Sequence, residues 1–199
     1  MRTTAPAPEF LTDHKGRPRA GFPVPLSYEQ ARLGMAFHEA GHAVLALAYG
    51  MRVNTSEVIV WEREEGGWGL TGSTNFASHG TPPWHFAAQC AAGEIAHVQY
   101  LLIRGLWTPD TAAACAAEHD REYAIDILAQ FGYRLGRDHT PHGGKSWSTV
   151  QGVARRKVGH LWREIRTVAH AMDEHTMLTG DNIAFLTGLA NPSFEGGDR

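Results

Sequence analysis

The stretch His38-Glu39-Ala40-Gly41-His42 places two histidines four residues apart within an apolar run. The run extends from Ser27 to Tyr49, its apolar residues recur at helical spacing, and no proline interrupts it. Ser27 is a suitable N-cap residue, and Gln30 three residues later completes a capping box. We therefore predict that residues 28–49 form a helix.

Histidines four residues apart on a helix lie one above the other on the same face, so both imidazoles can reach a single ion. Glu39 is offset toward the same opening, where its carboxylate can take a proton from a water activated by that ion. This H-E-x-x-H pattern is typical of zinc peptidases. We expect His38 and His42 to bind Zn²⁺, with Glu39 as the catalytic base. The alternative is a pair of buried or solvated histidines without a metal.

Length, charge and cysteine usage narrow the class of protein. A chain of 199 residues is long enough for one domain with a real core. Its 18 basic and 21 acidic residues give a formal net charge of −3, which does not favour nucleic acid as the main partner. Cys90 and Cys115 belong to no C-x-x-C pair, so we expect reduced, buried thiols in a cytoplasmic protein.

No segment of the sequence predicts insertion into a membrane. The longest apolar run, residues 43–51, is far shorter than a membrane-spanning helix. The N-terminal stretch lacks the apolar centre of a signal peptide. Residues 1–26 hold five of the ten prolines and are predicted to form a flexible arm. We expect the folded domain at 27–190 and a polar tail at 191–199.

The remaining periodicity predicts a mainly α (α+β) fold with a small antiparallel β-hairpin or sheet beside the metal-binding helix. Gly and Glu residues at 64–67 provide the turn of the hairpin. A break near residues 118–120 of the third helix, which begins at Thr108-Pro109, is left open. The expected elements are strands at 57–61 and 68–76, helices at 28–49, 84–104, from Thr108-Pro109 onward, at 149–175 and at 179–189, and a loop at 137–148.

A catalytic zinc usually has three protein ligands and one open position. The third ligand must come from elsewhere in the chain, because residues 43–52 contain no further histidine. Spacing does not choose among the acidic and histidine side chains of the later helices. These candidates are Glu94, His97, Glu118, His119, Asp120, Asp126, Glu164 and His170.

Three segments in order resemble the peptidase domain of the FtsH-type ATP-dependent zinc proteases. They are His38 to Val44, Ala91 to Ala96 and Glu118 to Ala124. The family has H-E-x-G-H-A, then G-G-R-x-A-E-E, then S-N-D-[ILF]-x-x-A-T, whose Asp is the third zinc ligand. The resemblance spans roughly residues 28–190 and implies a helical, zincin-like domain with Asp120 as third ligand.

The chain also departs from this family pattern. His97 and Val98 replace the paired acidic residues, and His119 replaces the Asn before Asp120. Glu118, His97 and Glu94 therefore stay as rival ligands. The chain contains no G-x-x-x-x-G-K-[ST] loop and none of the family's membrane segments.

We therefore predict a zinc-dependent, ATP-independent endopeptidase that acts on unfolded proteins or peptides, with no cofactor besides the metal. One strand of the hairpin can pair with an extended substrate. The oxyanion-stabilising residue is left open among His79, His85 and Tyr123. Members of the family form rings through this domain, so the resemblance is compatible with a homo-oligomer.

Two alternatives to a general peptidase remain. The first is a catalytically weak or inactive zinc-binding module with a regulatory or interaction role, which the missing ATPase and paired acids favour. The second is a regulatory peptidase that cleaves one separate partner protein. The sequence does not indicate the substrate or its sequence preference.

Overall fold

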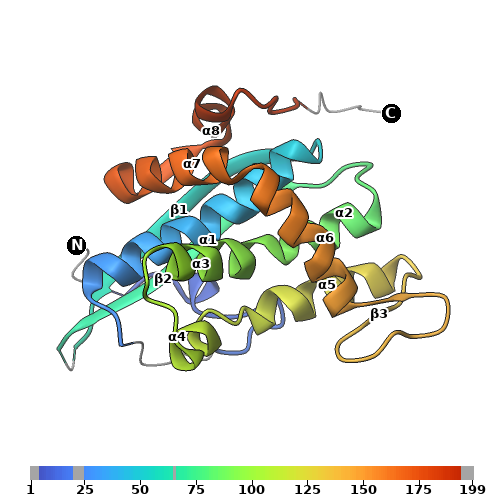
Figure 1. Cartoon of the computed structure of the whole chain (residues 1–199), viewed down its shortest axis with the longest axis horizontal. Coiled ribbons are helices and arrows are strands. Elements are labelled where there is room, and N and C mark those ends of the chain that lie inside the picture. The colour runs from blue at the N-terminus through green and yellow to red at the C-terminus, as the bar shows by residue number, and fades with distance from the viewer. Residues whose placement is uncertain (1–4, 20–24, 65, 194–199) are drawn as a thin grey trace.

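Helix α1 (Tyr28–Ala48) runs through the centre of the molecule (Figure 1) in the computed structural model, which describes residues 5–19, 25–64 and 66–193. The predicted capping box between Ser27 and Gln30 is present. Fourteen of the 21 residues of α1 are buried, because the sheet and helices α3 and α7 all pack against it. The two histidines therefore sit on the most enclosed helix of the described chain.

The predicted hairpin is confirmed and is longer than expected. Strand β1 (Arg52–Glu62) pairs antiparallel with β2 (Trp68–Ala77), and both strands pack against α1 and pass behind it in the view of Figure 1. A third strand, β5 (Met177–Thr179), pairs with the other edge of β1 and was not predicted. In the order β2-β1-β5, strand β2 forms one edge of the sheet.

The predicted helix 84–104 is wrong as a single element. It is divided into α2 (Pro83–Cys90) and α3 (Ala92–Ile103), and α3 packs along α1. At the break, the carbonyl of Gln89 faces α1 and accepts a hydrogen bond from His42. The change of direction thus gives α1 a polar contact from α2 and a close helical neighbour in α3.

The helix that begins at Thr108 is interrupted before residue 118, a point that the sequence left open. Helix α4 (Pro109–Ala114) begins with the predicted Thr108 cap, and α5 (Glu118–Gln130) follows after three residues. Two short parallel strands, β3 (Leu135–Gly136) and β4 (Lys145–Ser146), lie at the ends of the segment predicted as a loop.

The predicted helix 149–175 is also two helices, α6 (Trp147–His160) and α7 (Trp162–His175). The apolar stripe continues through the break at Leu161, so periodicity could not reveal it. The short helix α8 (Gly180–Thr187), capped by Thr179, closes the domain as predicted.

The mainly α (α+β) fold with a small antiparallel sheet is thus confirmed. No helix in the described residues is both long and apolar enough to traverse a bilayer. The arm predicted at 1–26 includes a described segment, residues 5–19, with a short 3₁₀ helix at Pro8–Phe10 that contacts β2. Residues 1–4, 20–24, 65 and 194–199, which belong to the predicted arm, turn and tail, lie outside the described residues.

Candidate metal centre

Three side chains from two distant parts of the chain meet below α1. His38 and His42 project from α1, and Asp120 lies in the first turn of α5. One ligand atom from each of the three lies within 4.8 Å of the other two. His42 Nε2 is 3.1 Å from both His38 Nε2 and Asp120 Oδ2, and His38 Nε2 is 3.4 Å from Asp120 Oδ2. The arrangement can hold a metal ion.

The orientation of His42 suits a metal ligand. Its Nδ1 donates a hydrogen bond to the backbone carbonyl of Gln89, at 2.9 Å. The neutral imidazole then carries its lone pair on Nε2, the atom that faces His38 and Asp120. A carbonyl on the outer nitrogen is the usual way in which proteins fix a metal-binding histidine.

The electrostatics of the cluster favour a cation. Burial alone would lower the pKa of His42, but the adjacent Asp120 carboxylate and the nearby Glu39 raise it to about 9. Burial would raise the pKa of Asp120, yet His42 and His119 hold it well below its usual range. The carboxylate is therefore ionised and draws positive charge toward the two imidazoles.

Glycines on two neighbouring elements make room for this cluster. A Cβ atom at Gly93 of α3 would lie 2.3 Å from His42 Nε2 and 2.5 Å from His38 Nε2. A Cβ atom at Gly41 of α1 itself would lie 2.7 Å from the Ala92 carbonyl oxygen. Helices α1 and α3 can approach each other at the ligands only because these side chains are missing.

Glu39 lies beside the three side chains of this cluster and is held by the sheet. Only 5 % of the residue is exposed. The Thr74 hydroxyl of β2 donates a hydrogen bond to Glu39 Oε2 at 2.7 Å, so the Ser56 hydroxyl, 2.8 Å away, donates to Thr74. A Cβ atom at Gly72 would lie 2.3 Å from Glu39 Oε1. Strand β2 therefore both orients the carboxylate and leaves space for it.

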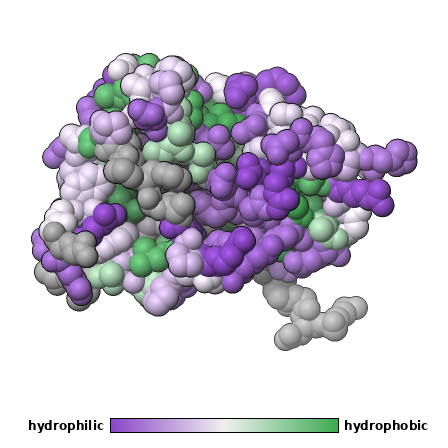
Figure 2. Space-filling model, turned by 90° about the horizontal axis from the view of Figure 1, so that it is seen from below, coloured by the Kyte–Doolittle hydropathy of each residue, from purple (hydrophilic) through white to green (hydrophobic). Residues whose placement is uncertain are grey.

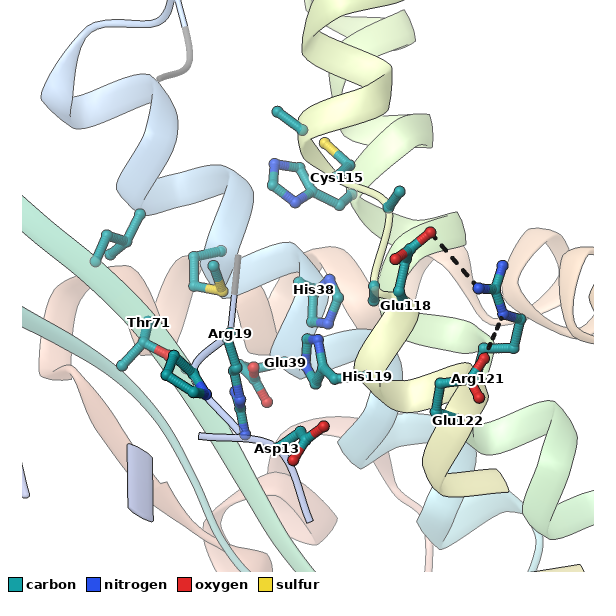
Figure 3. Close-up of a pocket in the computed structure, with 18 of the residues that line it drawn as sticks. Asp13, Arg19, His38, Glu39, Thr71, Cys115, Glu118, His119, Arg121 and Glu122 are labelled. Atoms are coloured by element: carbon teal, nitrogen blue, oxygen red, sulfur yellow. Dashed lines mark hydrogen bonds and ion pairs between the residues drawn. The ribbon is translucent and has the colours of Figure 1, made fainter. Parts of the chain in front are cut away.

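Two cavities of about 620 and 380 Å³ meet at this site. His38, Glu39 and His119 line both of them and are labelled in the close-up of Figure 3. Burial lowers the pKa of His119 to about 4, so its imidazole is neutral near pH 7. The face of the molecule seen from below is dominated by hydrophilic side chains in its right half (Figure 2). Most of the residues that line the two cavities are charged or polar.

The rival ligands lie outside the cluster. Burial raises the pKa of Glu94, which bonds to Gln151. His97 is buried with its Nε2 toward Gly34, and burial together with His38 lowers its pKa to about 3. Glu118 pairs with Arg121. The other candidates have other neighbours: Asp126 pairs with His14 and Lys15, Glu164 pairs with Arg163, and His170 packs edge-on against Phe37.

Among the residues considered for the oxyanion, only Tyr123 lines one of the two cavities. The ring of His85 stacks on Tyr49 with centroids 4.3 Å apart, and His79 does not line either cavity. Sequence reasoning missed Thr74 and the Gln89 carbonyl. In the sequence, Thr74 is marked only by being a hydroxyl residue on the predicted hairpin. The Gln89 carbonyl is a backbone group, so no residue type marks it.

The N-terminal segment was also missed as part of the site. Residues of this segment line both cavities, which composition alone did not indicate. Comparisons with known proteins add no assignment, because no protein-family model matches the chain and no curated protein matches it significantly.

Proposed function

We propose that the protein is a zinc-dependent, ATP-independent endopeptidase. The observation that carries this proposal is the spacing of the three ligand atoms, 3.1, 3.1 and 3.4 Å. Ligands at zinc distances of 2.0–2.1 Å in a tetrahedron are separated by about 3.3 Å. His38, His42 and Asp120 would therefore hold Zn²⁺ with little movement and leave a fourth position free.

The two cysteines lie outside the cluster formed by His38, His42 and Asp120. Burial raises the pKa of both thiols, that of Cys115 to about 12, so each stays protonated. Both are free, in keeping with the cytoplasmic location expected from the sequence.

When bound, the zinc would act as a Lewis acid that lowers the pKa of water toward about 7 and polarises the scissile carbonyl. The chain's own contribution begins with Glu39, which accepts the proton of the attacking water and passes it to the leaving amine. Thr74 holds Oε2 of this carboxylate, which leaves Oε1, beside Gly72, for proton transfer. His119 and Tyr123 line the cleft as donors for the developing oxyanion.

Strand β2 is suited to hold a peptide beside Glu39. It is an edge strand, and residues 70–74 line the cleft. An extended chain can add to such an edge through main-chain hydrogen bonds, which requires an unfolded protein or a peptide. The chain has no nucleotide-binding G-x-x-x-x-G-K-[ST] loop, in keeping with hydrolysis that does not consume ATP.

The test is the Glu39→Gln variant of the zinc-loaded protein. We expect stoichiometric zinc by elemental analysis and loss of cleavage of unfolded casein by at least 100-fold. Glu29→Gln is the matched control, since Glu29 is exposed in the first turn of the same helix. Undiminished cleavage by Glu39→Gln would remove the mechanism. Stoichiometric zinc without cleavage by the wild type would instead support the zinc-binding regulatory module.

A further inference from the structure

The N-terminal segment bridges the two sides of the cleft. The Thr71 hydroxyl of β2 donates a hydrogen bond to the Phe10 carbonyl at 3.2 Å. On the other side, Asp126 of α5 pairs with His14 at 2.6 Å and with Lys15 at 2.5 Å. Between these anchors, Asp13 lines both cavities and Thr12 lines the smaller one. The segment is therefore a wall of the site.

Within this wall, Arg19 is held by a closed loop. Thr12 and Pro18 form a β-bridge, and the backbone N–H of Arg19 donates to the Leu11 carbonyl at 2.9 Å. The Arg19 Nε donates to the Thr12 carbonyl, also at 2.9 Å. One N–H of the guanidinium thus fixes its position, and the Nη groups remain for another acceptor.

No acidic side chain among the described residues of the larger cavity pairs with Arg19. Arg19 and Glu39 face the same space in the close-up (Figure 3), and Glu39 is already bonded to Thr74. Among the described residues Arg19 forms no ion pair. The other cations of the cavity wall are paired: Arg17 with Asp13, Arg121 with Glu118 and Glu122, and Arg137 with Glu122.

We propose that Arg19 binds a carboxylate of the peptide substrate, so that the cleft selects acidic peptides. The proposal rests on the peptidase function and names its substrate class. A half-buried guanidinium with free Nη donors matches the planar geometry of a carboxylate and needs a counter-charge. The carboxylate belongs to an acidic side chain near the scissile bond or to the C-terminus of the peptide.

The experiment uses fluorogenic peptides with glutamate or glutamine at each position from three before to three after the scissile bond. Each is made as a free acid and as an amide, which separates the two sources of carboxylate. We expect the wild type to show a kcat/KM about tenfold higher for at least one carboxylate peptide than for its neutral match. Arg19→Gln should reduce this ratio to about one, and Arg19→Lys should keep part of it.

Arg137→Gln is the matched control. It makes the same change in net charge and removes a cation of the same cavity wall that is already paired with Glu122. We expect the preference to persist in this variant, with circular dichroism reporting the fold of each. A wild type without preference for any carboxylate, or a preference that survives Arg19→Gln, would overturn the proposal.

A binding assay distinguishes failure of this proposal from failure of the proposed peptidase function, because it does not require cleavage. The same peptides, labelled with a dye, are bound to the zinc-loaded Glu39→Gln variant and measured by fluorescence anisotropy. Tighter binding of carboxylate peptides that depends on Arg19 supports the carboxylate site even where no cleavage occurs. Equal binding of the matched acidic and neutral peptides contradicts it.

Discussion

The two sides of the candidate metal site differ in how the rest of the molecule holds them. Helix α1, which carries both histidines, is buried along most of its length. Helix α5, which carries Asp120, has only Ala124 and Leu128 buried among its 13 residues. The histidines are therefore placed by the core, whereas the carboxylate is placed by a helix with few apolar contacts. A bound metal would add the strongest link between these two sides.

The largest expected effect comes from filling the space between α1 and α3. In Gly93→Ala the new Cβ atom would press on both imidazoles, which must turn away from Asp120. We expect zinc affinity, measured by competition with a chelator, to fall at least 100-fold.

Gly159→Ala provides the control for this variant. A Cβ atom at Gly159 of α6 meets no other atom within 4 Å, so we expect unchanged zinc binding and a free energy of unfolding equal to or higher than that of the wild type. If Gly93→Ala bound zinc as tightly as the wild type, α1 and α3 would have moved apart to accept the Cβ atom, and the prediction would be wrong.

The second effect concerns pH, in the metal-free protein. The folded-state pKa of His42, about 9, lies above its ordinary value of 6.5. The protonated His42, held mainly by Asp120, therefore stabilises the fold fully below pH 6.5, by up to about 3 kcal/mol, and this contribution is lost as the pH rises through about 9. Urea unfolding of the wild type should show this decline.

Asp120→Asn removes the carboxylate that raises the pKa of His42. Its free energy of unfolding should vary much less between pH 6.5 and 9 than that of the wild type. Parallel pH profiles for the two proteins would contradict the ion pair. Asp120 itself has a pKa below its ordinary value. The stability that its ionised carboxylate contributes is therefore lost only as the pH falls into the acid range.

A smaller effect is expected from the hydroxyls that hold the Glu39 carboxylate. Thr74→Val removes the hydrogen bond to Glu39, and we expect kcat to fall about tenfold with zinc content unchanged. Ser56→Ala, one hydrogen bond further away, should cost about twofold. Thr167→Val on the exposed face of α7 is the control and should have no effect on kcat. Equal kcat values for Thr74→Val and the wild type would remove Thr74 from the site.

The smallest effect is expected at the α5 anchor of the N-terminal segment. Asp126→Asn breaks its ion pairs with His14 and Lys15, which are partly exposed, so the free energy of unfolding should change by less than about 1 kcal/mol. Amide hydrogen exchange of residues 8–19 should nevertheless become faster. Asp110→Asn, an exposed acid of α4, should leave that exchange unchanged.

The same contrast explains which features could be predicted from the sequence. The pentad and its capped helix are local patterns, so their position needed no knowledge of the fold. Asp120 was singled out only through a family resemblance, because 78 residues separate it from His42. Nothing in its immediate surroundings distinguishes it from the neighbouring acids.

Other features depend on contacts that leave no periodic trace. The breaks at Ala91 and Leu161 occur at ordinary helix-forming residues, and β5 has only three residues. The contacts of the N-terminal segment with the domain include polar groups of Phe10 and His14 that follow no periodic pattern. Such contacts become visible only when distant elements are placed together.

The glycines around the pentad have a consequence for recognising or designing such centres. A pair of histidines and a glutamate can occur on many helices, and acids that could complete them are common. The need for glycine at Gly41, Gly72 and Gly93 is a far stricter requirement, because these positions belong to three separate elements. Grafting the five-residue sequence onto another scaffold should therefore fail unless the recipient's adjoining helix and strand are emptied at the corresponding places.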